Sequence, residues 1–203
     1  MPTHLSKPSI QNCRLYVIID QATIAKRDPV SVARSAIRGG ADLIQWRDKA
    51  SSGIVFLETA KRLRKLTLEQ HVPLVINDRV SVALDVQADG VHLGHEDMPV
   101  TEARKLVGDS MMIGRSTHSL KEAQQAERDG SDYIAVGPIF STPTKPDYPV
   151  VGLELIAQVK QEIRIPWVTI GGIDLKNLPL VLSSGARCVA VVRAVAAASN
   201  PEA

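Results

Sequence analysis

The stretch MMIGRSTHSLKEAQQAERDGSDYIAVGP, from Met111 to Pro138, contains one structural unit that decides the fold of this chain. It begins with an apolar run that ends in polar residues. A segment follows whose apolar residues recur at three- and four-residue spacing, and a second apolar run ends the stretch. This order predicts a strand, a helix and a second strand. The GSD between the helical segment and the second run is typical of a helix that ends in a left-handed glycine.

The same unit recurs along the whole sequence. The apolar runs are RLYVII from Arg14, DLIQW from Asp42, PLVIN from Pro73, GVHLG from Gly90, MMIGRS from Met111, YIAVGP from Tyr133, PWVTIGG from Pro166 and CVAVVRA from Cys188. Segments of helical period lie between them, among them VSVARSAIRGG, FLETAKRLRKLTLEQH, SLKEAQQAERDG and LELIAQVKQEI. We expect C-terminal cap glycines in RGGAD, VQADG, ERDGSD and SSGAR.

Eight strand–helix units with nearly continuous apolar strands predict an α/β fold, a (β/α)8 TIM barrel. An open doubly wound sheet is the alternative, but eight units in only 203 residues favour the barrel. We expect a single domain over residues 1–203, with the first strand from about residue 14 and the last strand to about residue 195. Hydrophobic residues at 44% and charged residues at 23% are typical of a globular chain.

The composition excludes several classes of function. A net charge of +2 and only 3% aromatic residues argue against a protein that binds nucleic acid. Cys13 and Cys188 are interpreted as small buried residues rather than a disulfide or a metal pair. Nowhere do 18 consecutive apolar residues occur, and the first residues have no apolar signal region, so we expect a cytoplasmic protein without a membrane segment.

Polar residues follow nearly every predicted strand, at the end of a barrel where function collects. Gln45, Arg47 and Lys49 alternate, so they share one face of an extended segment. Inward cations at a strand end favour an anion site, although a solvated rim is the alternative. The proline-rich loop VGPIFSTPTKPDYP, from Val136 to Pro149, carries Lys145, which would add a positive charge when the loop closes over a phosphate.

Two acids, Asp78 and Asp97, follow neighbouring predicted strands, which brings their carboxylates together. Such a pair fits one Mg²⁺, and a salt-bridge network or a metal-free acid/base pair are the alternatives. The spacing of His92, His95 and His118 gives little support for zinc.

Glycines end the seventh predicted strand in TIGGI, which includes Gly171 and Gly172. Barrels often bind phosphate on the loops after strands seven and eight, and glycine allows a close approach of the backbone. The sequence therefore indicates two anion sites across the barrel mouth, one rich in cations and one backed by glycine. Two sites suit a reaction between two phosphorylated molecules, or one molecule with phosphates at both ends.

The stretches QWRDK, INDR, DGVHLGHED, IGRSTHS, VGPIFSTPTK and TIGGI occur in this order and closely resemble thiamine-phosphate synthase. The resemblance runs from about Arg14 to about Val195, and it implies a (β/α)8 barrel. The implied reaction joins hydroxymethylpyrimidine diphosphate to thiazole phosphate, with Mg²⁺, and releases pyrophosphate in a dissociative mechanism. The implied partners are these two small molecules, and a homodimer is expected from the family alone.

The resemblance also implies roles for individual residues. Asp78 and Asp97 match the family's Mg²⁺ ligands. The residues that match contacts to the pyrimidine diphosphate are Gln45, Arg47, Lys49, Asn77, Ser116 and Lys145, and those that match the thiazole phosphate site are Thr142, Thr144 and Gly172. Arg47, Lys49 and Lys145 are expected to assist catalysis by stabilising the leaving pyrophosphate.

The chain departs from the family pattern at two positions. Arg193 stands where many members have a serine that helps to hold the thiazole phosphate, and Arg115 stands where a small apolar residue is common. Arg193 can bind the phosphate, while either arginine pointing outward is the alternative. Two other functions remain open at this point: a thiazole tautomerase on the same barrel, and a non-catalytic binder of phosphorylated thiamine precursors.

Overall fold

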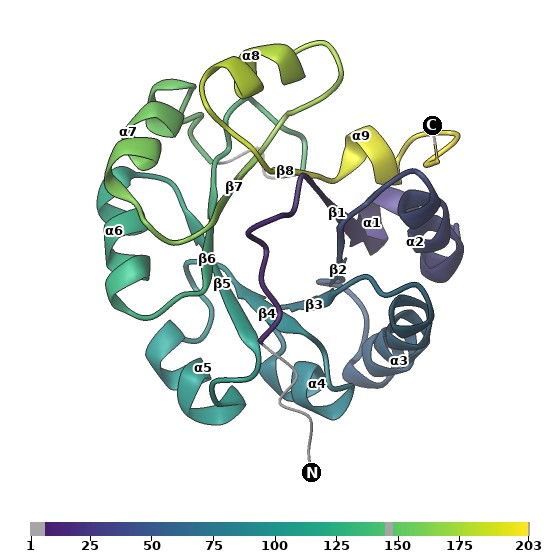
Figure 1. Cartoon of the computed structure of the whole chain (residues 1–203). Helices are drawn as coiled ribbons and strands as arrows, with labels where there is room; N and C mark the ends of the chain where they lie inside the picture. Colours follow the sequence, from purple (N-terminus) through teal and green to yellow (C-terminus); the bar gives the residue numbers. More distant parts are fainter. Residues whose placement is uncertain (1–6, 145–147, 203) are drawn as a thin grey trace.

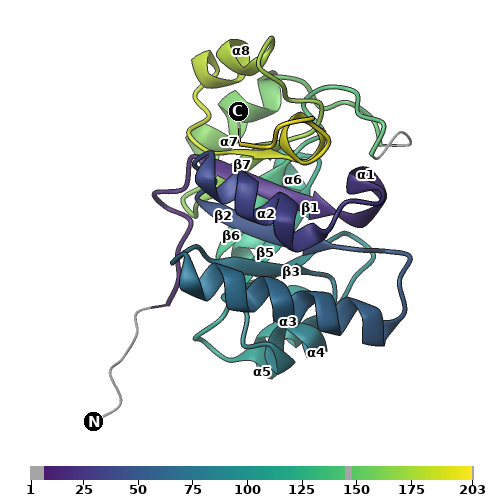
Figure 2. The same ribbon diagram turned by 90° about the vertical axis from the view of Figure 1, so that its right-hand side faces the viewer.

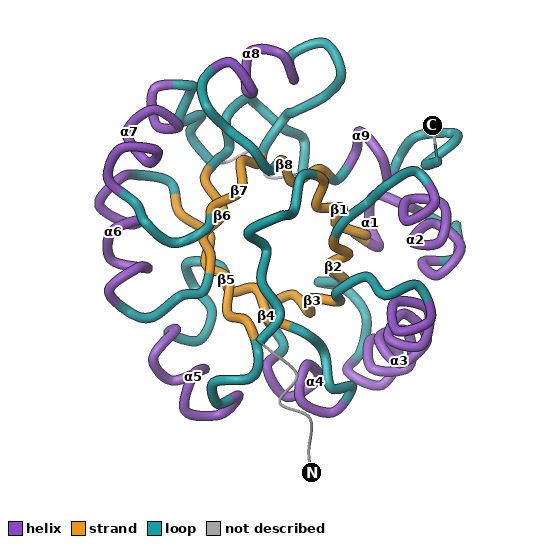
Figure 3. The backbone as a smooth tube through the Cα atoms, viewed as in Figure 1, coloured by secondary structure: helices purple, strands orange, loops and turns teal. Residues whose placement is uncertain are grey.

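The computed structural model describes residues 7–144 and 148–202, and its eight strands close into a parallel barrel in chain order (Figure 1). The strands form an inner ring and the helices an outer one (Figure 3). The (β/α)8 prediction is confirmed, and the open sheet is excluded. The strands are β1 (Leu15–Asp20), β2 (Leu43–Arg47), β3 (Leu74–Asn77), β4 (Gly90–Leu93), β5 (Met112–Thr117), β6 (Tyr133–Val136), β7 (Trp167–Ile170) and β8 (Val189–Val191).

The helices follow the strands around the outside of the barrel. They are α1 (Gln21–Ile24), α2 (Pro29–Arg38), α3 (Gly53–Glu69), α4 (Val80–Asp85), α5 (Val100–Val107), α6 (Leu120–Arg128), α7 (Glu154–Glu162), α8 (Leu178–Ser183) and α9 (Arg193–Ala196). The start of α6 shows the local logic: the Ser119 side chain accepts from the N–H of Glu122, and the Glu122 carboxylate accepts from the N–H of His118. None of the helices in the described ranges is long and apolar enough to cross a membrane.

Each strand buries both of its faces, and alternate residues enter different cores. In β1, Tyr16 and Ile18 belong to the cluster inside the barrel, whereas Val17 and Ile19 pack between the strands and the helices. In β2, Trp46 points outward and its ring centroid lies 5.6 Å from that of Phe56. Residues 45 and 47 therefore face inward, as the alternation predicted.

Aspartates at the starts of alternate strands fix the register at the N-terminal end of the barrel. Asp42 accepts from the backbone N–H of Leu15 at 2.9 Å, and Asp89 accepts from that of Leu74 at 2.8 Å. Asp132 likewise accepts from Ile113 at 2.7 Å. Each carboxylate takes an N–H at the start of the preceding strand, from the first residue of β1 and of β3 and from the second residue of β5.

The turns that return the chain to the barrel use the left-handed region, as predicted, at Gly40, Gly130 and Gly185, with φ of 97°, 85° and 105°. The prediction for VQADG is wrong. Gln87 takes φ 51° there, because the turn follows directly on α4, and Gly90 is already the first residue of β4.

The first described residues close the barrel end opposite the loop that follows β6 (Figure 2). Ile10 and Cys13 are buried there, and the N–H of Cys13 donates to the carbonyl of Ile10. The Sγ atom of Cys13 lies 3.3 Å from that of Cys188, and both thiols are free. The interpretation of the two cysteines as small buried residues is confirmed.

Candidate active site

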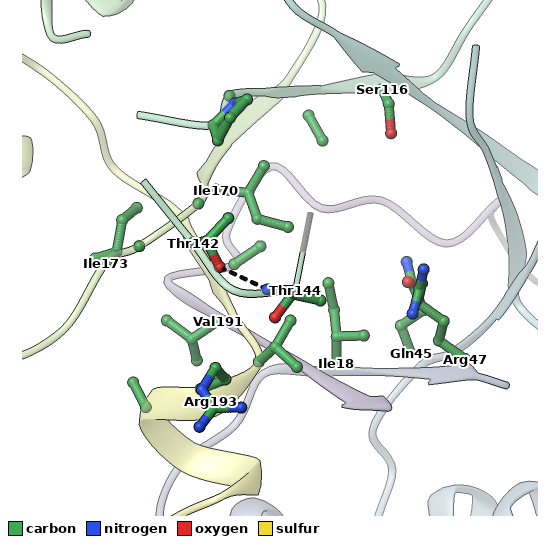
Figure 4. A pocket seen from close by; sticks show the side chains of 18 of the residues that line it. Ile18, Gln45, Arg47, Ser116, Thr142, Thr144, Ile170, Ile173, Val191 and Arg193 are labelled. Carbon is green, nitrogen blue, oxygen red and sulfur yellow. Dashed lines mark hydrogen bonds between the residues drawn. The ribbon is translucent and has the colours of Figure 1, made fainter. Parts of the chain in front are cut away.

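A cavity of about 440 Å³ opens at the carboxyl ends of the strands. Figure 4 shows Gln45 and Arg47 on one side of it and Arg193, at the start of α9, on another. The structure brings together in its walls eight of the residues that the sequence singled out: Gln45, Arg47, Asn77, Ser116, Thr142, Thr144, Gly172 and Arg193.

Three further residues to which the sequence assigned a role, Lys49, Asp78 and Asp97, do not line this cavity. Lys49, Asp78 and Asp97 form a cluster of their own, in which the Lys49 ammonium is ion-paired with Asp78. Lys145 lies outside the described residues. Arg47 and Asn77, which line the cavity, stand two residues before Lys49 and one residue before Asp78 in the chain.

The two acids of this cluster are in direct contact through a side-chain hydrogen bond, so the predicted approach of Asp78 and Asp97 is confirmed. Burial raises the pKa of Asp78, and the neighbouring Asp97 raises it further against the opposing charge of Lys49. Burial acts in the same direction on Asp97, but hydrogen bonds from Asp78 and from the N–H of Gly94 lower the pKa of Asp97 below its ordinary value. Of the two acids, Asp78 therefore binds a proton more readily than Asp97.

Arg47 has a partner that the sequence reasoning missed. Its guanidinium is ion-paired with Asp20, the last residue of β1, and Asp20 is only 2% exposed. Asp20 also accepts from the N–H of Thr23 at the start of α1. The signal was present, because an aspartate ends the first apolar run just as polar residues end the others. Part of the Arg47 charge is thus balanced before any anion binds.

The glycine-backed wall of the cavity is built by two loops that touch. The N–H groups of Ile139 and Phe140, after β6, donate to the carbonyls of Ile170, the last residue of β7, and Gly171, the next residue. Gly172 has φ 64°, and a Cβ atom there would lie 2.6 Å from the carbonyl oxygen of Ser141. Glycine is required here for the contact between the loops as well as for its backbone angle.

Ser116 and His92 meet in the cavity floor, where the Oγ of Ser116 lies 3.0 Å from the Nε2 of His92. The other ring nitrogen, Nδ1, lies 3.1 Å from the hydroxyl of Tyr133. His92 thus contacts Ser116 and Tyr133 inside the barrel. The sequence analysis considered His92 only as a zinc ligand and missed these contacts.

Comparison with known proteins identifies the family. The sequence model of the family described as thiamine monophosphate synthase matches residues 15–195. This chain belongs to that family. The thiamine-phosphate synthase of Chloroflexus aurantiacus is 47% identical over 197 residues, which cover 97% of this chain and 91% of the relative. That of Shouchella clausii is 46% identical over 94% of this chain and 91% of its own.

Solved structures agree with the family assignment. The thiamine phosphate pyrophosphorylase of Pyrococcus furiosus superposes with a TM-score of 0.87 at 40% identity, covering 94% of this chain and 90% of the other. The N-acetylmannosamine-6-phosphate 2-epimerase of Clostridium perfringens has a TM-score of 0.72 at 16% identity, covering 96% and 93%. The second likeness concerns the barrel fold alone.

The two arginines that depart from the thiamine monophosphate synthase pattern have different surroundings. Arg115 lies outside the cavity lining, where its guanidinium donates to the carbonyl of His95 at 3.2 Å and reaches that of Met98 at 3.5 Å. Arg193 lines the cavity, and within the described ranges its guanidinium has no hydrogen bond or ion pair, although its backbone carbonyl accepts from the N–H of Ala197. Arg115 therefore tethers the loop after β4, and Arg193 offers its charge to a ligand.

Proposed function

We propose that this chain joins 4-amino-2-methyl-5-hydroxymethylpyrimidine diphosphate to 4-methyl-5-(2-phosphoethyl)thiazole and releases thiamine phosphate and pyrophosphate. One observation carries this proposal: the chain is 47% identical, over 97% of its length, to a thiamine-phosphate synthase. The cavity supports it, because residues matching the family's contacts to both substrates line one enclosed space.

The diphosphate binds on the β2 to β5 side of the cavity in this proposal. Arg47 and Gln45 reach it from β2, Asn77 from the end of β3 and Ser116 from β5. Lys49 and Lys145 supply further positive charge. Arg47 is ion-paired with Asp20 and Lys49 with Asp78, so part of both charges is balanced before the diphosphate binds.

The thiazole phosphate binds against the loops after β6 and β7. Thr142 and Thr144 lie on the first of these loops, and Gly172 on the second. Arg193 faces the same space from the start of α9 and adds a bidentate donor for a phosphate (Figure 4).

The reaction breaks the bond between the pyrimidine methylene carbon and the diphosphate oxygen, and the electron pair leaves with pyrophosphate. The methylene cation is stabilised by the electron-rich aminopyrimidine, and the ring nitrogen of the thiazole then supplies the pair for the new C–N bond. The nucleophile is neutral at nitrogen, so no strong general base is needed. The main task of the side chains is to stabilise the leaving group and to exclude water from the cation.

The acid pair fits Mg²⁺. Asp78 and Asp97 offer hard oxygen donors that lie against each other, and each carboxylate shifts the pKa of the other, as expected for two acids that could share one cation. No cluster of three or more His, Cys, Asp or Glu side chains in the described ranges forms a metal site, so substrate oxygens and water would complete the coordination. Bound Mg²⁺ supplies charge to the leaving pyrophosphate.

We also propose that the protein acts in the cytoplasm as a single barrel domain, and that it forms a homodimer as expected for the family. Its partners in the reaction are the two phosphorylated small molecules.

A coupling assay tests the function. The purified protein is mixed with both substrates and Mg²⁺, and thiamine phosphate is converted to thiochrome and measured by fluorescence. Product that disappears with EDTA is the expected result. Absence of product, with substrates that a known synthase converts, would refute the proposal. The tautomerase reaction would then be assayed, and tight diphosphate binding without turnover would favour a non-catalytic binder.

A further inference from the structure

Five polar side chains form a continuous hydrogen-bonded chain across the barrel interior. The Nε2 of Gln45 lies 2.6 Å from the hydroxyl of Tyr16, which lies 3.0 Å from that of Tyr133. Tyr133 lies 3.1 Å from Nδ1 of His92, and Nε2 of His92 lies 3.0 Å from Oγ of Ser116. Gln45, His92 and Ser116 line the cavity, whereas Tyr16 and Tyr133 are 1% and 0% exposed in the core beneath it.

The chain has one direction because each hydroxyl has a single proton to give. The amide NH₂ of Gln45 donates to Tyr16, so the proton of Tyr16 goes to Tyr133. Tyr133 then donates to Nδ1 of His92, and the ring proton of His92 stays on Nε2 and is donated to Ser116. The proton of the Ser116 hydroxyl is left to point into the cavity.

The same direction favours a neutral His92 over a doubly protonated one. An imidazolium would donate from Nδ1 to Tyr133, whose proton would have to go to Tyr16. The proton of Tyr16 would then meet the NH₂ of Gln45, which is itself a donor. Burial raises the pKa of both tyrosines well above their ordinary value, so each keeps the proton that the chain requires.

The backbone leaves space for these five hydrogen-bonded side chains. Gly114 of β5 pairs with Tyr133 of β6, and a Cβ atom at Gly114 would lie 2.4 Å from the Tyr133 hydroxyl oxygen. The ring centroid of Tyr133 lies 6.2 Å from that of Tyr16 and 5.6 Å from that of His92. Because even a methyl group at Gly114 would displace the phenol, the position of the hydroxyl is set by the strand itself.

We propose that Tyr16, Tyr133 and His92 are positioning residues that hold the Ser116 hydroxyl as a hydrogen-bond donor toward an anionic substrate. The inference rests on the proposed function only for the identity of this anion as a diphosphate. A donor that is oriented before the ligand arrives needs no reorganisation when negative charge develops on the leaving group. The far end of the chain holds the amide of Gln45 in the same manner.

The first test is the tautomer of His92, measured by long-range ¹⁵N–¹H NMR on the labelled full chain without ligand. The His92 signals are assigned by their loss in His92→Asn. Between pH 6 and 8 we expect the neutral ring with its proton on Nε2. A ring protonated on Nδ1, alone or together with Nε2, would overturn the inference. The NMR measurement needs no enzymatic activity, so its result does not depend on the outcome of the coupling assay.

The second test is a double-mutant cycle with Tyr133→Phe and Ser116→Ala. The affinity for pyrophosphate with Mg²⁺ is measured by calorimetry. We expect each single variant to weaken binding about tenfold, the worth of one hydrogen bond to a charged group. The double variant should lose no more than Ser116→Ala alone, because Tyr133 acts through Ser116. Losses that add independently, or an unchanged affinity in Tyr133→Phe, would contradict the proposal.

Thr169→Val is the matched control. The Thr169 hydroxyl is buried and donates to the carbonyl of Cys188 at 3.2 Å. Thr169 neither lines the cavity nor belongs to the five hydrogen-bonded side chains. Its loss should lower stability to a similar extent as Tyr133→Phe while the His92 tautomer and the pyrophosphate affinity stay unchanged. A variant Tyr133→Phe that fails to fold leaves the tautomer of the unmodified protein as the deciding measurement.

Discussion

Asp20, at the end of β1, forms an ion pair with Arg47, which ends β2 and lines the cavity. The two residues are paired in the register of the parallel strands, so the contact follows directly from the closure of the barrel. The pair keeps an inward arginine in place in the empty protein, where an unpaired cation would be costly.

Asp20→Asn should therefore lower the free energy of unfolding by about 3 kcal/mol, because it leaves the Arg47 charge largely buried without its partner. Urea denaturation measures this loss. Glu58→Gln is the control, since it breaks the exposed ion pair with Lys61 and should change stability by less than about 1 kcal/mol. Equal effects of the two substitutions would show that Asp20 does not hold Arg47.

The opposite pKa shifts of Asp78 and Asp97 predict a pH dependence of stability in the metal-free protein. The pKa of Asp78 is raised on folding, so its contribution to stability is full below the pKa of the unfolded chain, about 3.9, and is lost as the pH rises through the raised value. The pKa of Asp97 is lowered, so its contribution is lost only as the pH falls through the lowered value.

Asp78→Asn keeps a donor to Asp97 at every pH. The variant should therefore not lose stability as the pH rises through the raised pKa of Asp78. With EDTA, the Tm of the unmodified protein should fall relative to that of the variant as the pH rises from about 4 through the raised pKa of Asp78. Adding Mg²⁺ at pH 8 should raise the Tm of the unmodified protein only. Parallel curves with EDTA, or equal stabilisation by Mg²⁺, would count against the acid pair as the metal site.

Arg193→Ser should raise KM for the thiazole phosphate about tenfold, because one charge-assisted contact is removed. The KM for the pyrimidine diphosphate should stay unchanged. Arg187→Ser is the matched control, since this exposed arginine precedes β8, at the other end of the same strand. An unchanged KM in Arg193→Ser would mean that the guanidinium does not touch the phosphate.

Gly172→Ala should destabilise the protein by about 2 kcal/mol and reduce kcat/KM for the thiazole phosphate, because the new methyl group meets the carbonyl of Ser141 and φ is positive. Thermal and urea unfolding measure the first effect and steady-state kinetics the second. In the control Gly53→Ala no atom lies within 4 Å of the added carbon, and the helix start should tolerate it. Loss of stability without a change in KM would mean that Gly172 supports the contact between the two loops but takes no part in binding the thiazole phosphate.

The sequence was sufficient to predict the strands, since each begins at or one residue after the start of its apolar run. The alternation in QWRDK placed residues 45 and 47 inward correctly, because the period of an extended chain is the same in any sheet. The order of the strands then brought Asp78 and Asp97 together.

The contacts across the barrel could not be predicted in this way. Tyr16 and Tyr133 are separated by 117 positions, and their hydroxyl contact depends on ring size and on Gly114 at the neighbouring strand. The alternation of apolar residues shows that both side chains point into the barrel, but not where along the barrel axis each hydroxyl lies. The turn at Gln87 was missed for a related reason: the length of α4, rather than the nearest glycine, decides where the chain turns.

The most direct measurement of the central claim is ³¹P NMR of the protein with both substrates and Mg²⁺. The account predicts that pyrophosphate and thiamine phosphate appear in equal amounts as the pyrimidine diphosphate disappears. Diphosphate that stays intact, or pyrophosphate without thiamine phosphate, would contradict the claim that this cavity joins the two substrates.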